Sequence, residues 1–192
     1  MKYDAIKKVT VALQLRLKDS LKALDEVDHP EVFIGPLDDR DSRGAHLILF
    51  LYRICPNGDL RNSERRVLSA AGTDVEVFQN SLPLNLHYLL TVGTTFGSEQ
   101  GKLSALGLAM QTLQADPVLT GPSLETTRVS LEPLSTDQSS RIWNLFPNVN
   151  YRTSVGYFVS PVWIDPAEPE ESAEVVVDGT LRAGVKPSEV AT

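Results

Sequence analysis

The stretch from His46 to Ile54, with the sequence HLILFLYRI, constrains the fold of this chain more than any other segment. Successive side chains of a β-strand point to opposite faces, so a strand over this stretch has two apolar faces. One face carries Ile48, Phe50, Tyr52 and Ile54, and the other carries Leu47, Leu49 and Leu51. Such a strand belongs in the interior of a sheet. The sequence therefore predicts a sheet that is covered on both sides.

Two segments have the spacing of amphipathic helices, and they are candidates to cover that sheet. In the first, from Tyr3 to Leu24, apolar residues recur every three or four positions and form one stripe. This stripe consists of Ile6, Val9, Leu13, Leu17, Leu21 and Leu24. The second helix is predicted from Ser98 to Gln114, before Ala115-Asp116-Pro117, with a stripe of Leu103, Leu106, Met110 and Leu113. We expect both stripes to be buried.

The remaining apolar segments predict further strands and one short helix. Strands are expected at 31–37, 84–92, 126–131 and 151–165, and a short one at 75–78 within a loop excursion over 59–82. In the last long strand, Val155, Tyr157, Val159 and Trp163 are assigned to one face, and Gly156 and Pro161 suggest a bulge or an edge position. Ser135 and Gln138 form a possible capping box, which would start the short helix. The predicted fold class is α+β, with a mixed, mainly antiparallel sheet flanked by helices.

The composition changes after Asp165, which divides the chain into a predicted globular domain, 1–165, and an acidic segment, 166–192. The segment contains six acidic residues against Arg182 and Lys186, and it opens with the linker-like sequence PAEPEES. Within it, the stretch from Glu174 to Ala183 is strand-like, with a turn at Asp178-Gly179. Two alternatives remain open. The stretch adds a strand to a neighbouring protein, or it is a disordered tail that aids solubility.

Charge and composition argue against several classes of partner. The net charge is −7, the arginines are scattered, and no basic face is evident, so a nucleic-acid partner is not expected. No run approaches the roughly 18 apolar residues that a membrane helix needs, so no membrane association is expected either. The single cysteine, Cys55, precludes an internal disulfide bond and a metal site built from several cysteines.

Motifs that would indicate catalysis are lacking in the sequence. The histidines His29, His46 and His87 have no metal-binding spacing, and no serine lies in a G-x-S-x-G motif. The segment 97–103 departs from a phosphate-binding loop at two of its four defining positions. Cys55 has only Arg53 as a basic neighbour in sequence, so we interpret it as a structural residue. We predict no catalytic, cofactor-binding or metal-binding residues, no cofactor and no enzymatic activity, unless the histidines and acidic residues converge in one pocket.

Six segments follow one another in a fixed order and span residues 3–165 almost without a gap. The segments are YDAIKKVTVALQLRL, LFLYRICPNGDLRN, PLNLHYLLTVGTTFG, LGLAMQTLQADPVL, VSLEPLSTDQSSRIWNLF and YRTSVGYFVSPVWID. Each segment is weakly specific alone, but together they resemble a known family, the tail-terminator or cap proteins of extracellular contractile injection systems, which are phage-tail-like particles. Some members of the family carry further material after this domain, whereas here a short acidic segment follows.

The resemblance implies a structural role. Such proteins are similar to phage tail terminators: they form a six-fold ring that ends the inner tube and anchors the last layer of the sheath. By this resemblance, the expected partners are other copies of the chain in a homohexamer ring, a tail sheath protein and an inner tube protein. The expected location is the cytoplasm during assembly and then the assembled particle, which can be released.

A monomeric adaptor, another tail-completion protein and an uncharacterised enzyme remain as alternatives. Candidate contact residues are Trp143, Phe146, Tyr157 and Trp163, of which we expect at least half to be buried in the core.

Overall fold

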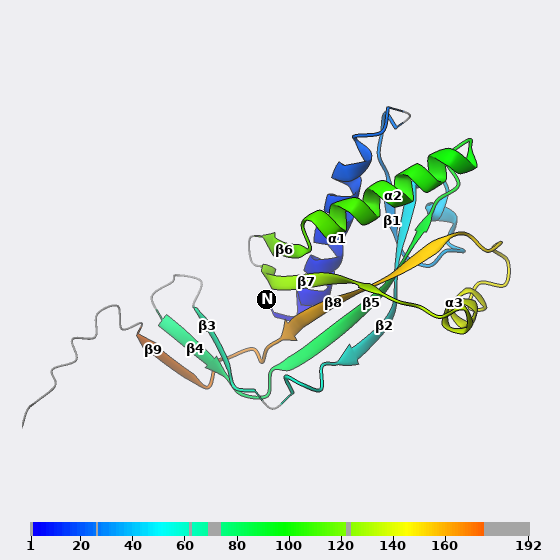
Figure 1. Ribbon diagram of the computed structural model, residues 1–192. Helices are drawn as coiled ribbons and strands as arrows, with labels where there is room; N and C mark the ends of the chain where they lie inside the picture. The colour runs from blue at the N-terminus through cyan, green and yellow to red at the C-terminus, as the bar shows by residue number, and fades with distance from the viewer. Residues whose placement is uncertain (1, 26, 62, 69–73, 122–123, 175–192) are drawn as a thin grey trace, which may run out of the picture.

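The computed structural model describes residues 2–25, 27–61, 63–68, 74–121 and 124–174. The helices are α1 (Ala5–Leu21), α2 (Glu99–Ala115) and α3 (Thr136–Trp143), with 3-10 turns at Lys2–Asp4 and Arg40–Ser42. The strands are β1 (Val32–Ile34), β2 (Leu47–Pro56), β3 (Arg65–Leu68), β4 (Asp74–Phe78), β5 (Leu82–Val92), β6 (Val118–Gly121), β7 (Leu124–Glu132), β8 (Ser154–Ile164) and β9 (Glu171–Glu174). The strands form two sheets, one large and one small (Figure 1).

The large sheet has six strands in the order β1-β2-β5-β8-β7-β6. Its first pair, β1 and β2, is parallel, and the other neighbouring pairs are antiparallel. The apolar stretch that was predicted as an interior strand is β2, which lies between β1 and β5. This arrangement confirms the predicted fold class, a mixed and mainly antiparallel sheet with helices. Three strands had no exact counterpart in the prediction: β6 was not foreseen, β3 lies in the excursion that was interpreted as loop, and β9 lies in the predicted linker.

One face of the large sheet packs against α1 and α2 and forms the larger core. The predicted stripe of α1 is confirmed, because Val9, Leu13, Leu17 and Leu21 are buried and Ile6 and Leu24 pack at the margin. The predicted stripe of α2 is confirmed at Leu106 and Leu113, which are buried, and at Met110, which packs against the core. Leu103 is 56% exposed, and small residues take its place in the core. The buried residues of α2 are Gly101, Ala105, Leu106, Ala109 and Leu113. Small side chains allow α2 to approach its neighbours closely. A prediction that considers large apolar residues alone does not detect this close packing.

The opposite face of the sheet packs against α3 and forms a second core. Strand β2 contributes Ile48 to this second core, and Phe50 and Tyr52 pack at its margin. Leu47 and Leu49 of the same strand belong to the first core. The prediction of a strand with two apolar faces is thereby confirmed. The capping box of α3 is also confirmed: Ser135 Oγ accepts the N–H of Gln138, and the Gln138 side chain accepts the N–H of Ser135. This second core is filled by Leu37, Ala45, Ile48, Leu89, Ile142, Trp143 and Phe146.

Irregularities in β2 and β8 correct two face assignments and confirm a predicted bulge. The register between β5 and β8 shifts after Leu84, so Val162 and not Trp163 continues the buried face of β8. Between Val159 and Val162, β8 has one residue more than the paired part of β5, so the bulge suggested by Pro161 is present. Neither Gly156 nor Pro161 marks a sheet edge, since β8 lies between β5 and β7. A second shift, between Leu51 and Arg53, places Ile54 opposite Leu86 and removes it from the face that was predicted for it.

The small sheet, in the order β3-β4-β9, extends beyond the ends of β5 and β8 (Figure 1). Its last strand, β9, begins at Glu171, within the stretch that was predicted to be a linker, and pairs antiparallel with β4. Arg65, which is 8% exposed, connects the two sheets. Its guanidinium lies over the ring of Trp163, 4.5 Å from the ring centre, and its Nε is 2.7 Å from Asp165 Oδ1. The predicted strand over 174–183 lies outside the described residues except for Glu174.

Candidate functional site

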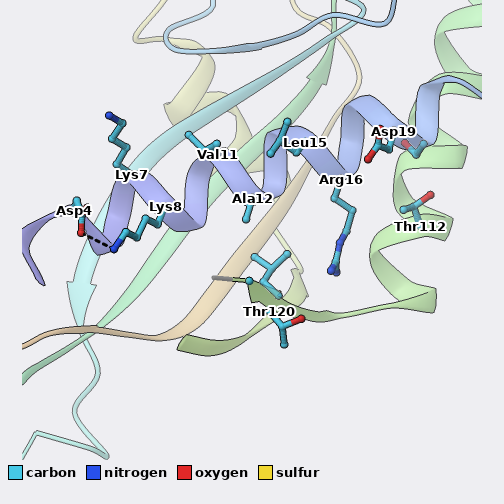
Figure 2. A pocket seen from close by; sticks show the side chains of 13 residues that line it. Asp4, Lys7, Lys8, Val11, Ala12, Leu15, Arg16, Asp19, Thr112 and Thr120 are labelled. Atoms are coloured by element: carbon cyan, nitrogen blue, oxygen red, sulfur yellow. Dashed lines mark ion pairs between the residues drawn. The ribbon is translucent and has the colours of Figure 1, made fainter. Parts of the chain in front are cut away.

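A groove of about 690 Å³ lies between α1 and the edge strand β6 (Figure 2). One wall is the outer side of α1, where Val11, Ala12 and Leu15 face away from the sheet. The other wall comes from Leu119, Thr120 and Gly121 of β6, with Thr112 of α2 at one end. Leu15 is 55% exposed although the opposite side of α1 is fully buried. The helix thus presents a second apolar face, toward the groove.

Arg16 fixes the geometry of this groove. Its Nη2 donates to the carbonyl of Val118 at 3.0 Å, and its Nη1 donates to the carbonyl of Asp116. The Asp116 carboxylate also lies 3.0 Å from Nη2. These contacts join α1 to the end of α2 and the start of β6. Arg16 therefore holds the two walls of the groove at a fixed separation.

The groove is lined by charged side chains of both signs. Lys7, Lys8 and Arg16 line it together with the carboxylates of Asp4 and Asp19, and Lys8 pairs with Asp4 at 3.1 Å. Among the described lining residues there is no histidine or cysteine. Its chemistry suits the binding of a polypeptide segment that carries apolar and acidic side chains.

A second, smaller hollow of about 480 Å³ lies where β5 ends and α2 begins. Leu103 and Tyr151 are its exposed apolar residues, and Lys102 and Arg152 contribute positive charge. Burial lowers the pKa of Arg152, and its Nη1 donates to the carbonyl of Val92 at 3.4 Å. The exposure of Leu103 is thus explained by its place at this hollow and not in the core.

The four aromatic residues that were predicted as contact candidates fall into two groups. Trp143 and Phe146 lie in the second core and Tyr157 lies in the first, all three buried. Trp163 is half-buried and stacks on Arg65. The expectation that at least half of them are buried is confirmed. The sequence did not indicate the groove, because Leu15 belongs to neither the predicted stripe nor a motif.

The histidines do not converge, although one of them has a notable environment. His29 is exposed, and His46 is buried, with its Nδ1 accepting the N–H of Glu31. His87, by contrast, lies between Cys55 and Glu132. Within the part of the chain that the structure describes, no three His, Cys, Asp or Glu side chains are placed to hold a metal ion. The segment 97–103 begins α2, where Ser98 Oγ accepts the N–H of Gly101.

None of the described helices combines the length and apolar character needed to cross a bilayer. A comparison with curated proteins found no match. A family model described as the Pvc16 N-terminal domain matches residues 8–178, which include both sheets.

Two solved structures share the fold. One is the sheath/tube terminator of an extracellular contractile injection system, PVC, in the extended state, with a TM-score of 0.56 and 18% identity. The other is the tube-terminating cap of the anti-feeding prophage, with a TM-score of 0.57 and 18% identity. Each comparison covers 93% of this chain, and the chain spans 65% and 61% of the two proteins, respectively.

Proposed function

Because this chain belongs to the family of the Pvc16 N-terminal domain, we propose that it is a structural cap that ends the tail of a contractile injection system. In this proposal, copies of the chain form a ring, a homohexamer, on the last layer of the inner tube and anchor the last layer of the sheath. The protein acts by binding and not by catalysis. The observation that supports the proposal most strongly is the match to this family over residues 8–178.

The architecture suits a load-bearing subunit. A contracting sheath pulls on the protein that anchors it, so the subunit must resist deformation. The large sheet is packed on both faces, by α1 and α2 on one side and α3 on the other, and close-packed interiors transmit strain with little compression. The globular body over 1–165 supplies this rigidity in the proposal, and the segment 166–192 supplies contacts.

We assign the contact between ring neighbours to the groove along α1. Its occupant in this proposal is the stretch from Glu174 to Ala183 of a second copy, which combines a β-prone valine run with acidic residues. The groove offers the exposed Leu15, basic side chains and the edge strand β6. An extended segment can add to such an edge through main-chain hydrogen bonds. The stretch carries two acidic residues and one arginine, and the groove is lined by three basic residues and two carboxylates.

Electron microscopy of particles from a producing strain that lacks this protein tests the proposed function. Without a cap, tube and sheath growth has no stop, so we expect structures of uncontrolled length or tails that fall apart at one end. Expression of the chain from a plasmid should restore uniform particles. Normal yield and normal length in the deletion strain would refute a capping role.

The Leu15→Glu variant tests the groove separately. Leu15 is largely exposed, so the monomer should fold, whereas the new carboxylate would repel an acidic occupant. We expect the variant to lose ring formation and capping. Leu145→Glu, at another exposed apolar position, is the matched control. Light scattering after chromatography, with and without tube and sheath, distinguishes a ring from a monomeric adaptor. Equal assembly by both variants would exclude the groove as the contact.

A further inference from the structure

A chain of hydrogen bonds connects four side chains on the α3 face of the large sheet, away from the groove. The Tyr52 hydroxyl lies 2.8 Å from Glu132 Oε2. His87 Nδ1 lies 2.9 Å from both Glu132 oxygens, and His87 Nε2 lies 3.1 Å from the sulfur of Cys55. The sequence places these residues far apart, and nothing in the proposed capping function uses them.

The donors and acceptors of this chain can be assigned in one consistent way. An ionised carboxylate only accepts hydrogen bonds, so Tyr52 and His87 Nδ1–H both donate to Glu132. The proton on Nδ1 leaves a lone pair on Nε2, which accepts the S–H of Cys55. Burial, and then the hydrogen bond to Glu132 and its charge, raise the pKa of Tyr52, which keeps this phenol protonated as a donor. His87 is thereby held in the tautomer of a general base.

The fold explains why these residues meet. Cys55 and His87 come from the neighbouring strands β2 and β5, where the register shift in β2 brings Cys55 to the side of His87. Glu132 belongs to β7, which β8 separates from β5. The residue of β8 opposite Glu132 is Gly156, and its missing side chain leaves room for Leu134, which follows β7. The Glu132 carboxylate reaches across β8 to His87 Nδ1, at 2.9 Å.

We propose that Cys55, His87 and Glu132 form a thiol-modification site whose reagent class is small peroxides. Cys55 is half-buried and the His87 side chain is 12% exposed, so the site opens to small molecules. His87 is the general base that takes the thiol proton, and Glu132 is a positioning residue that orients the imidazole and stabilises its charged form. The proposal does not depend on the capping function.

The reaction with hydrogen peroxide balances as a two-electron oxidation. The Cys55 sulfur attacks one peroxide oxygen, an S–O bond forms and the O–O bond breaks. The sulfur is oxidised and the peroxide is reduced. The thiol proton passes to His87 Nε2 and then to the departing hydroxide, which leaves as water. The product is a sulfenic acid. Cys55 is the single cysteine of the sequence, so a disulfide can form only with a thiol on another molecule.

The rate of sulfenic acid formation on the full chain tests this proposal. The protein is treated with hydrogen peroxide at pH 7, the product is trapped with dimedone, and the modified fraction is followed by mass spectrometry. A synthetic peptide of residues 51–59 gives the rate for the same cysteine without the site. We expect the folded protein to react about tenfold faster than the peptide or more, since a general base activates the thiol. A folded protein that reacts at the peptide rate or slower refutes the proposal.

Variants assign the roles of the two partners. His87→Gln removes the base and should lower the rate to that of the peptide, while His29→Gln, at an exposed position, should leave it unchanged. Glu132→Gln keeps an acceptor for Nδ1–H and should retain part of the rate that Glu132→Ala loses. Circular dichroism verifies the fold of each variant. A rate that His87→Gln leaves unchanged contradicts the role of the base, and equal rates for the two Glu132 variants contradict the positioning role. If the His87→Gln variant fails to fold, the comparison of the unmodified folded protein with the peptide still tests the proposal.

Discussion

The large and small sheets of this protein are held in place by different forces. The large sheet lies between two apolar cores, and the side chains of its central strands pack into both of them. In β3 and β4 of the small sheet, Phe78 is buried, whereas Leu68 is exposed. Arg65 links the small sheet to the large one through Asp165, Glu125 and the ring of Trp163. The first sheet is stabilised by buried apolar area, and the second depends on one buried cation.

The sequences of the strands account for this difference. The stretch LILFLYRI of β2 supplies apolar side chains to both faces, while RRVL of β3 and DVEVF of β4 carry charged residues between apolar ones. Burying apolar surface contributes about 25 cal/mol per Å², so a strand with two apolar faces gains roughly twice as much from being covered. We therefore expect the small sheet to open before the large sheet unfolds.

The largest expected effect comes from removing a side chain of the first core. Leu17 of α1 is fully buried, and Leu17→Ala should lower the free energy of unfolding by about 2–5 kcal/mol. Leu15→Ala, on the exposed side of the same helix, should change it by less than about 0.5 kcal/mol. Urea denaturation followed by circular dichroism measures both. A loss below 0.5 kcal/mol for Leu17→Ala would show that α1 does not hold this core.

Alkaline pH should lower the free energy of unfolding through Tyr88, which lies in the large sheet. Burial raises the pKa of Tyr88 to about 12, from 10.0, and its hydroxyl lies 2.9 Å from Thr10 Oγ1. Because the unfolded chain loses this proton first, the free energy of unfolding should fall as the pH rises from 10 to 12, by about 2–3 kcal/mol for this group. Below pH 10 the effect should be absent. Denaturation at pH 9 and pH 11.5 measures the decrease, and Tyr88→Phe should make it smaller. An equal decrease in the variant would exclude Tyr88 as its source.

Replacing Arg65 should affect the small sheet and leave the large one intact. In Arg65→Met, the Asp165 carboxylate, whose side chain is 6% exposed, loses its cation while Ser81 still donates to it. A buried polar group without its partner costs about 1–3 kcal/mol. We expect faster hydrogen exchange in β3 and β4 and little change in β2 and β5. Arg66→Ala, at an exposed ion pair with Glu64, is the control. Uniformly faster exchange in both sheets would indicate that they unfold as one unit.

The smallest effect on stability is expected from shortening the chain after residue 174. Deleting residues 175–192 leaves β9 in place, and deleting residues 170–192 removes β9 and exposes the edge of β4. Both deletions should leave the urea midpoint of the large sheet nearly unchanged. Both should abolish ring formation if the segment occupies a neighbour's groove. Normal capping by the first deletion would refute that role and favour a segment that only aids solubility. The boundary at residue 165 remains a prediction.

The sequence alone determined the parts of the fold that follow from local periodicity. The two-sided strand β2, the buried stripe of α1 and the capping box at Ser135 each depend on residues within a few positions of one another. The apolar pattern also indicated the fold class, because a strand with two apolar faces requires cover on both sides. The ordered resemblance of six segments indicated the family. These features depend on side-chain type and spacing, which the sequence displays directly.

Only the tertiary structure decided the features that depend on strand register and on pairing between distant segments. The register shifts turn Trp163 and Ile54 to other faces, and an alternating pattern has no signal for a single inserted residue. The groove exists because Arg16 reaches residues about one hundred positions away. Likewise, Cys55 has only Arg53 near it in sequence, but the order of the strands brings His87 and Glu132 beside it. Contacts across a sheet are set by which strands become neighbours, and local spacing does not record that choice.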